Sequence, residues 1–179
     1  SDKAVFETMV KEAGGNPASS KVVTVGFGGI QALLAGRISG FTGYIPADAT
    51  VVESRGRKTR SFAFDDFGGP PYPGLVGFST GSRIDEDPEL MEAFVSATIA
   101  GYRQALNDPD GAVSAMVESV PEMDPDLARR TFLAYGPLIG DAETLGSIDR
   151  ESVADLSAFM VDQGLVPAPF EPDQFDATP

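Results

Sequence analysis

Residues 21–44 read KVVTVGFGGIQALLAGRISGFTGY, and this stretch decides the expected fold. It opens with a short β-branched run, KVVTVGF (21–27), which is typical of a strand. Two glycines then lead into apolar residues at helical spacing, which predict a helix over 29–38. GFTGYI (40–45) predicts the next strand. A strand, a helix and a strand in this order indicate a βαβ unit with a mainly parallel sheet.

The flanking sequence extends this unit into a larger α/β lobe. An apolar stripe predicts a helix over 3–13, and a short apolar run predicts a strand at 61–64. We expect one sheet, parallel between its first two strands, with the helices packed on it. The strands expected in this sheet are 22–27, 40–45 and 75–80.

The second half of the chain has a helical pattern. Three amphipathic runs each follow an Asp-Pro pair, and a fourth apolar stripe ends before Gly164. Asp as N-cap with Pro at the first helical position is a start signal, since the carboxylate accepts from free backbone N–H groups and Pro has none. The pairs are Asp87–Pro88, Asp108–Pro109 and Asp124–Pro125. We therefore predict two parts, an α/β lobe over 1–82 and a helical segment over 83–179.

Composition limits the chemistry that this chain can perform. The 179 residues include no cysteine and no histidine, which excludes disulfides, thiolate metal sites and a cysteine nucleophile and removes the usual general base. The net charge is −14, with nine basic against seven acidic residues up to 84 and four against twenty afterwards. A polyanion partner such as nucleic acid or an acidic membrane would be repelled by the second half. The basic run RGRKTR (55–60) is interpreted as a solvated loop between two strands.

The main candidate site lies just after the strand predicted at 40–45. Tyr44 and Asp48 follow its carboxyl end, where ligands usually bind in open α/β sheets, and Pro46 opens a helix there. Two interpretations are open on the local sequence. Either Tyr44 and Asp48 contact a ligand, or Tyr44 covers the edge of the core while Asp48 caps the helix.

Other candidate positions have simpler structural explanations. VGFGG (25–29) could bind phosphate at a helix N-terminus, but it lacks the spacing of a dinucleotide or P-loop motif and is interpreted as a tight turn. Phe27 could line a pocket or fill the core, and the core is favoured. Asp2 is explained by the start of the first helix, and Tyr72 by a surface ring among prolines.

The order of several motifs resembles one protein family. These are S-D-x-x-V-x-x-T-M-V (1–10), K-V-V-x-V-G-F with A-L-L-A-G-R-I, F-T-G-Y, P-P-Y-P-G-L-V-G-F-S-T, and D-P-E-L-x-x-x-F-V-x-A-x-x-x-G-Y-R-x-A-L-x-D-P. Together they resemble the thiamine-pyrimidine-precursor-binding family of ABC transporter solute-binding proteins, which is related to sulfonate and nitrate binders. The likeness covers essentially the whole chain but only the second half of the longer family pattern.

The resemblance implies a fold and a set of ligand contacts. It implies the second lobe of a type II periplasmic-binding-protein-like fold, followed by C-terminal helices that return to a first lobe outside this sequence. It implies that Tyr44 stacks on the ligand and that Asp48, where the family usually has Glu, accepts a hydrogen bond from it. Ile45 stands where an aromatic residue is often found. Asp2, Phe27 and Tyr72 would face the cleft.

The resemblance also implies partners and a location. It implies a small heterocyclic solute, an ABC transporter membrane permease and an extracytoplasmic protein whose signal is not in this sequence, with no nucleic acid, cofactor or metal. A sulfonate- or nitrate-type receptor is the alternative, and an interaction domain without a ligand stays open. A pyrimidine-synthase-like enzyme is disfavoured because it would need a histidine and a cysteine-rich iron motif. Apolar helix faces around Phe94, Tyr102, Met116 and Phe132 predict a homo-oligomer.

Overall fold

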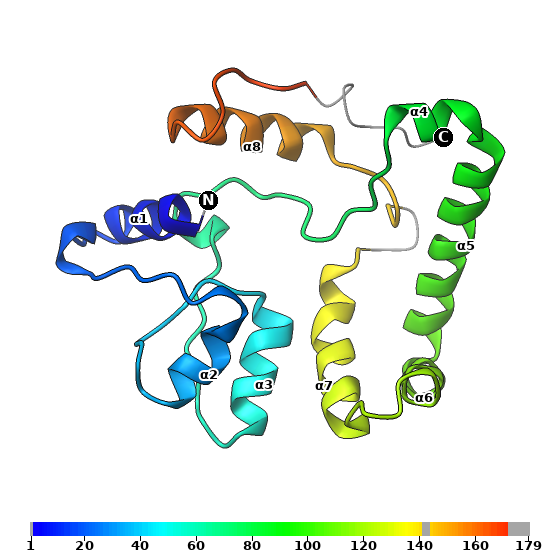
Figure 1. Cartoon of the computed structure of the whole chain (residues 1–179), viewed down its shortest axis with the longest axis horizontal. Helices are drawn as coiled ribbons and strands as arrows, with labels where there is room; N and C mark the ends of the chain where they lie inside the picture. The colour runs from blue at the N-terminus through cyan, green and yellow to red at the C-terminus, as the bar shows by residue number, and fades with distance from the viewer. Residues whose placement is uncertain (1, 141–143, 172–179) are drawn as a thin grey trace. The chain divides into compact units, whose positions relative to one another are not determined.

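A computed structural model describes residues 2–140 and 144–171 of the chain (Figure 1). The chain divides into two compact units. The described part of the first unit contains residues 2–72 and 149–171, and that of the second contains 73–140 and 144–148. The predicted boundary at residue 82 stays a prediction.

The first unit is built from helices joined by long loops without regular structure (Figure 1). Helix α1, predicted at 3–13, is confirmed, with an acidic residue in its first turn and Lys11 in its last, as the helix dipole favours. Gly14 follows it at a φ of 75°, which only glycine adopts without strain. Helix α2 is shorter than the predicted 29–38. The helices of this unit are α1 Asp2–Glu12, α2 Gly29–Leu34, α3 Thr50–Ser54 and α8 Arg150–Asp162.

Helix α8 confirms the last helix expected from the sequence. Its N-cap is Asp149, whose carboxylate accepts from the N–H groups of Glu151 and Ser152. The Ser152 hydroxyl also donates to this carboxylate, and this bond is the main reason why the pKa of Asp149 lies below its ordinary value. Ser157 is buried, and its hydroxyl accepts from the Phe170 N–H at 2.8 Å. The chain after α8 is therefore tied back to it.

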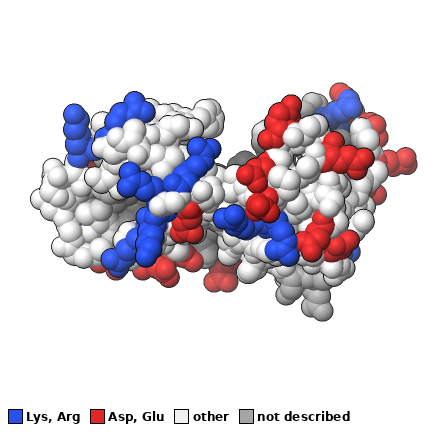
Figure 2. Space-filling model, turned by 90° about the horizontal axis from the view of Figure 1, so that it is seen from below, with Lys and Arg blue, Asp and Glu red and all other residues white. Residues whose placement is uncertain are grey.

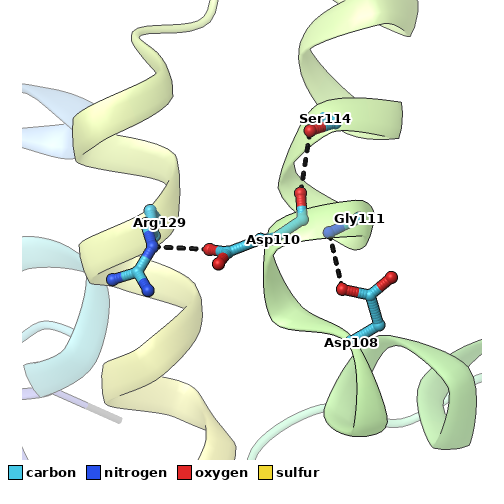
Figure 3. Close-up of polar contacts among 5 residues, drawn as sticks. All are labelled: Asp108, Asp110, Gly111, Ser114 and Arg129. Carbon is cyan, nitrogen blue, oxygen red and sulfur yellow. Dashed lines mark hydrogen bonds and ion pairs between the residues drawn. The ribbon is translucent and has the colours of Figure 1, made fainter.

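The second unit confirms all three Asp-Pro helix starts. Asp87, Asp108 and Asp124 each accept hydrogen bonds from backbone N–H groups of the first turn (Figure 3 shows Asp108 and Gly111). A Cβ at Gly111 would approach the Asp108 carboxylate so closely that this side chain would have to shift. The helices are α4 Gly81–Glu86, α5 Pro88–Asn107, α6 Pro109–Ser119 and α7 Pro125–Tyr135.

Helix α6 packs against both α5 and α7. Val113 of α6 and Ala128 of α7 are buried. Arg129 Nε donates to Asp110 Oδ1 at 2.6 Å between α7 and α6, and this bond raises the pKa of the Arg129 guanidinium above its ordinary value (Figure 3). No helix among the described residues is long and apolar enough to cross a membrane.

The predicted strands do not form in the described part of the chain. No ladder joins the segments 21–25, 40–44, 61–64 and 75–80, and no backbone hydrogen bond connects any two of them. The β-branched pattern shows that these residues suit a sheet, but a strand exists only when a second strand pairs with it. The α/β prediction is therefore not confirmed for these residues, and the expected parallel sheet is absent from them.

Much apolar surface remains uncovered as a result. Leu75 is 84% and Phe78 96% exposed in one predicted strand, and Val22 and Val23 are exposed in another. Of the four apolar residues expected on uncovered helix faces, Phe94 and Met116 are exposed. Tyr102 and Phe132 are half-buried. Homo-oligomer formation stays a prediction.

The cap of α7 gives a direct test of the second unit. Asp124 Oδ1 accepts from two backbone N–H groups, at 2.9 Å and 3.0 Å. We expect Asp124→Ala to lower the free energy of unfolding by about 1 kcal/mol, since both N–H groups lose this acceptor. Urea unfolding followed by circular dichroism measures the change. Glu122→Ala, at an exposed position in the preceding turn, is the control. Equal stability of the two variants would contradict the role of the cap.

Candidate functional site

The segment Phe41–Asp48 forms a tight corner in the first unit. Tyr44 has an extended backbone (φ −91°, ψ 111°) and precedes a five-residue π-helical segment, Ile45–Ala49, that continues into α3. Pro46 lies in the first turn, where its missing N–H leaves no bond unmade, and it is buried. The sequence therefore sets the start of this helix where it was predicted.

A pair of hydrogen bonds closes the corner. The Tyr44 N–H donates to Asp48 Oδ2 at 2.7 Å, and the Asp48 N–H donates to the Tyr44 carbonyl at 2.8 Å. The side chain reaches back to the N-cap N–H in the manner of the second residue of a capping box. The capping interpretation of Asp48 is therefore confirmed. No hydrogen bond involves Asp48 Oδ1 among the described residues, so this oxygen keeps its lone pairs.

Two side chains lie close to the glycine at the centre of the corner. A Cβ on Gly43 would collide with Asp48 Oδ2 and would lie 2.9 Å from the ring of Phe41. A Cβ on Gly29, at the start of α2, would lie 2.8 Å from the same ring. The Phe41 side chain thus fills the space between the two glycines. Sequence reasoning missed this role of Phe41, although the spacing F-x-G in FTGY was a usable signal.

Tyr44 presents its side chain to solvent. It is 59% exposed, and the neighbouring Ile45 is exposed as well. No ring contact joins Tyr44 to another aromatic side chain in the described residues. This exposure does not support the alternative in which Tyr44 covers the edge of the core. The exposed Tyr44 ring is thus accessible, and its backbone is bonded to a carboxylate that keeps one free oxygen among the described residues.

The other candidate residues are Asp2, Phe27 and Tyr72. Among the described residues, neither aromatic ring of this set contacts the ring of Tyr44. Phe27 lies in the glycine turn before α2 and is 109% exposed, so the expectation that it fills the core is wrong. Tyr72 packs edge-to-face on Phe64, at 6.3 Å between ring centroids, and Phe64 does the same on Phe159 of α8, at 5.3 Å. Asp2 begins α1 and is exposed.

The glycine-rich turn before α2 supports the simpler of its two explanations. Gly26 has a φ of 53°, and Gly26–Gly28 form one 3-10 turn before the helix. This conformation accounts for the first glycine without a ligand. In the part of the chain that the structure describes, no group of acidic side chains could hold a metal ion.

Comparison with known proteins identifies the family. Residues 1–112 match the family described as NMT1/THI5 like. The chain belongs to the NMT1/THI5-like family. This assignment confirms the resemblance found in the sequence motifs. The formylaminopyrimidine-binding protein of Halalkalibacterium halodurans is 29% identical to the chain over 122 residues, which is 68% of the chain.

The match covers 37% of that relative's length, so the chain spans well under two thirds of it. Membership in the NMT1/THI5-like family implies a periplasmic-binding-like fold. In such folds a strand pairs with neighbours from distant parts of the sequence, which is consistent with segments that have strand character but no partner in the described residues. The matched region 1–112 contains the Tyr44–Asp48 corner.

Proposed function

We propose that this protein is a solute-binding component of an ABC importer and that it binds a pyrimidine bearing an amino group. The observation that carries the proposal is the Tyr44–Asp48 corner, within the region that matches the NMT1/THI5-like family. The name of the Halalkalibacterium relative, a formylaminopyrimidine-binding protein, supports this class of ligand. The protein would work outside the cytoplasm and deliver its ligand to a membrane permease.

The proposed binding mode uses one aromatic face and one carboxylate oxygen. The exposed ring of Tyr44 stacks on the planar heterocycle, which contributes about 1 kcal/mol beyond the burial of area. Asp48 Oδ1 accepts from the exocyclic amine in a charge-assisted hydrogen bond. Asp48 Oδ2 meanwhile stays bonded to the Tyr44 backbone N–H. This bond fixes the carboxylate next to Tyr44 before the ligand arrives, which lowers the entropic cost of binding.

The binding role is favoured over catalysis by the side chains present. The chain contains no histidine or cysteine, so it lacks the groups that most often act as general base, thiolate nucleophile or transition-metal ligand. Asp2, Phe27 and Tyr72 stay proposals as additional ligand contacts. Phe27 is fully exposed and Tyr72 is about half exposed, so both rings are accessible to a ligand.

Asp48→Asn tests the role of the carboxylate. The amide oxygen can still accept from the Tyr44 N–H, so the corner is kept while the charge is removed. We expect affinity for a formylaminopyrimidine to fall about 10- to 100-fold, since a charge-assisted bond becomes a neutral one. Affinity for an alkanesulfonate or nitrate should not fall. Isothermal titration calorimetry of the 179-residue protein measures each value.

Asp66→Asn is the matched control, because it removes the same charge from an exposed turn of the first unit, Asp65–Phe67. It should leave affinity unchanged. Equal affinity of the wild type and Asp48→Asn for pyrimidines would refute the contact. Tighter binding of sulfonates than of pyrimidines by the wild type would favour the anion-receptor alternative.

A further inference from the structure

A second feature of the first unit is not used by the corner site. The basic loop, defined as residues 55–60 (RGRKTR), directly follows α3. Its base is anchored: the N–H groups of Arg55 and Arg57 both donate to the carbonyl of Val52, which is only 2% exposed. Gly56 adopts a φ of 76° and allows the chain to reverse there. The loop therefore presents its side chains from a fixed turn.

The charges of the basic loop are not neutralised by the protein. Arg55, Arg57, Lys58 and Arg60 are exposed, and none forms an ion pair with a carboxylate in the described part of the chain. The nearest acidic residue along the chain, Glu53, accepts from the Thr59 hydroxyl at 2.6 Å. Figure 2 shows Lys and Arg side chains gathered over the first unit, while Asp and Glu predominate over the second.

An aromatic ring accompanies these charges. The guanidinium carbon of Arg60 lies 4.8 Å from the centroid of Phe62, whose ring is half exposed. A cation over an exposed ring has both an apolar face and a charge available. This combination suits the boundary between lipid headgroups and water, where aromatic and basic side chains are enriched.

The basic loop does not form a site for one small anion. The hollow at its base is open and is lined by Glu53, Gly56, Arg57, Lys58 and Thr59, so a carboxylate lies among the cations. A phosphate site needs several donors that converge on one point. An extended negative surface needs no such convergence but only several exposed cations close together, and the basic loop supplies four within six residues.

We propose that the basic loop docks the protein onto an anionic phospholipid bilayer. At 0.1 M salt, charges more than about 10 Å from the lipid surface are largely screened, so the cations nearest the surface decide the attraction despite the net charge of −14. Docking would hold a binding protein close to the membrane. The proposal goes beyond ligand binding and does not depend on Tyr44 or Asp48.

Vesicle co-sedimentation of the full chain tests this proposal. We expect binding at 0.1 M NaCl to vesicles of equal parts phosphatidylglycerol and phosphatidylcholine, and none to pure phosphatidylcholine. The double variant Arg57→Gln/Lys58→Gln should lower the partition coefficient about 30-fold. Each of the two cations is expected to contribute about equally to the attraction to the anionic lipid surface, and the two factors multiply. Raising NaCl to 0.5 M should abolish binding because the attraction is electrostatic.

The matched control is Lys21→Gln/Arg37→Gln, which removes the same charge from exposed positions of the same unit. It should change the partition coefficient less than threefold. An equal loss in both double variants, or no vesicle binding by the wild type, would overturn the proposal. Tighter binding to a single-stranded RNA oligonucleotide than to vesicles would overturn it as well. Pyrimidine affinity, measured in parallel, should be the same in all three proteins.

Discussion

Tyr44→Ala is expected to lower the affinity for a formylaminopyrimidine about 5- to 150-fold, because stacking and the burial of apolar area are lost together. The fold should be unaffected, since the ring is 59% exposed and packs on no other ring in the described residues. Titration calorimetry gives the affinity, and urea unfolding gives the stability. Tyr44→Phe keeps the ring and should stay within about threefold of the wild type.

Phe62→Ala is the matched control for Tyr44→Ala. Phe62 is a half-exposed aromatic residue of the same unit, but its ring is next to the basic loop. Its removal should leave pyrimidine affinity unchanged. If Tyr44→Ala lowers stability and leaves affinity intact, the corner is a structural feature only, and the proposed function loses its main support.

Gly43→Ala is expected to disturb both stability and binding. Its Cβ would collide with the Asp48 carboxylate and press on the ring of Phe41, so at least one of them has to move. We expect the free energy of unfolding to fall by about 1 kcal/mol, the low end of overpacking costs, because Gly43 is exposed and the atoms in the way belong to side chains that can rotate aside. Pyrimidine affinity should fall in parallel, because Asp48 leaves its position. Chemical unfolding and calorimetry measure the two effects.

Gly40→Ala is the control for Gly43→Ala, since nothing lies within 4 Å of the Cβ that it would add. It should be close to neutral in both assays. If the two glycine variants behave alike, the close approach of the carboxylate to Gly43 has no energetic weight.

The sequence predicted the features that depend on neighbouring residues. The Asp-Pro pairs place a carboxylate and a residue without an N–H side by side, so Asp87, Asp108 and Asp124 start helices whatever surrounds them. Asp48 was also predictable as a cap from local sequence, because it follows Tyr44 by four residues and lies near the start of the helix that Pro46 opens.

The features that depend on distant residues could not be predicted in this way. The strand at 75–80 was expected from its apolar residues, but the described chain offers it no partner, and Phe78 is exposed. Phe27 was placed in the core by its hydrophobicity, which says nothing about whether anything covers it. The Phe41 ring lies close to Gly29 at the start of α2 and to Gly43 just before the Ile45–Ala49 segment. Gly29 is distant from Phe41 in the sequence, so only the folded chain brings them together.

The bond between Asp48 and the Tyr44 backbone also restricts how this protein could evolve toward a new ligand. A substitution at position 48 changes the polar contact offered to the solute and the start of the helix at the same time. Position 45 has no such double role, because the Ile45 side chain is exposed. Mutational drift in ligand preference is therefore less constrained at position 45, while position 48 is restricted to side chains with an oxygen that still accepts from the Tyr44 N–H.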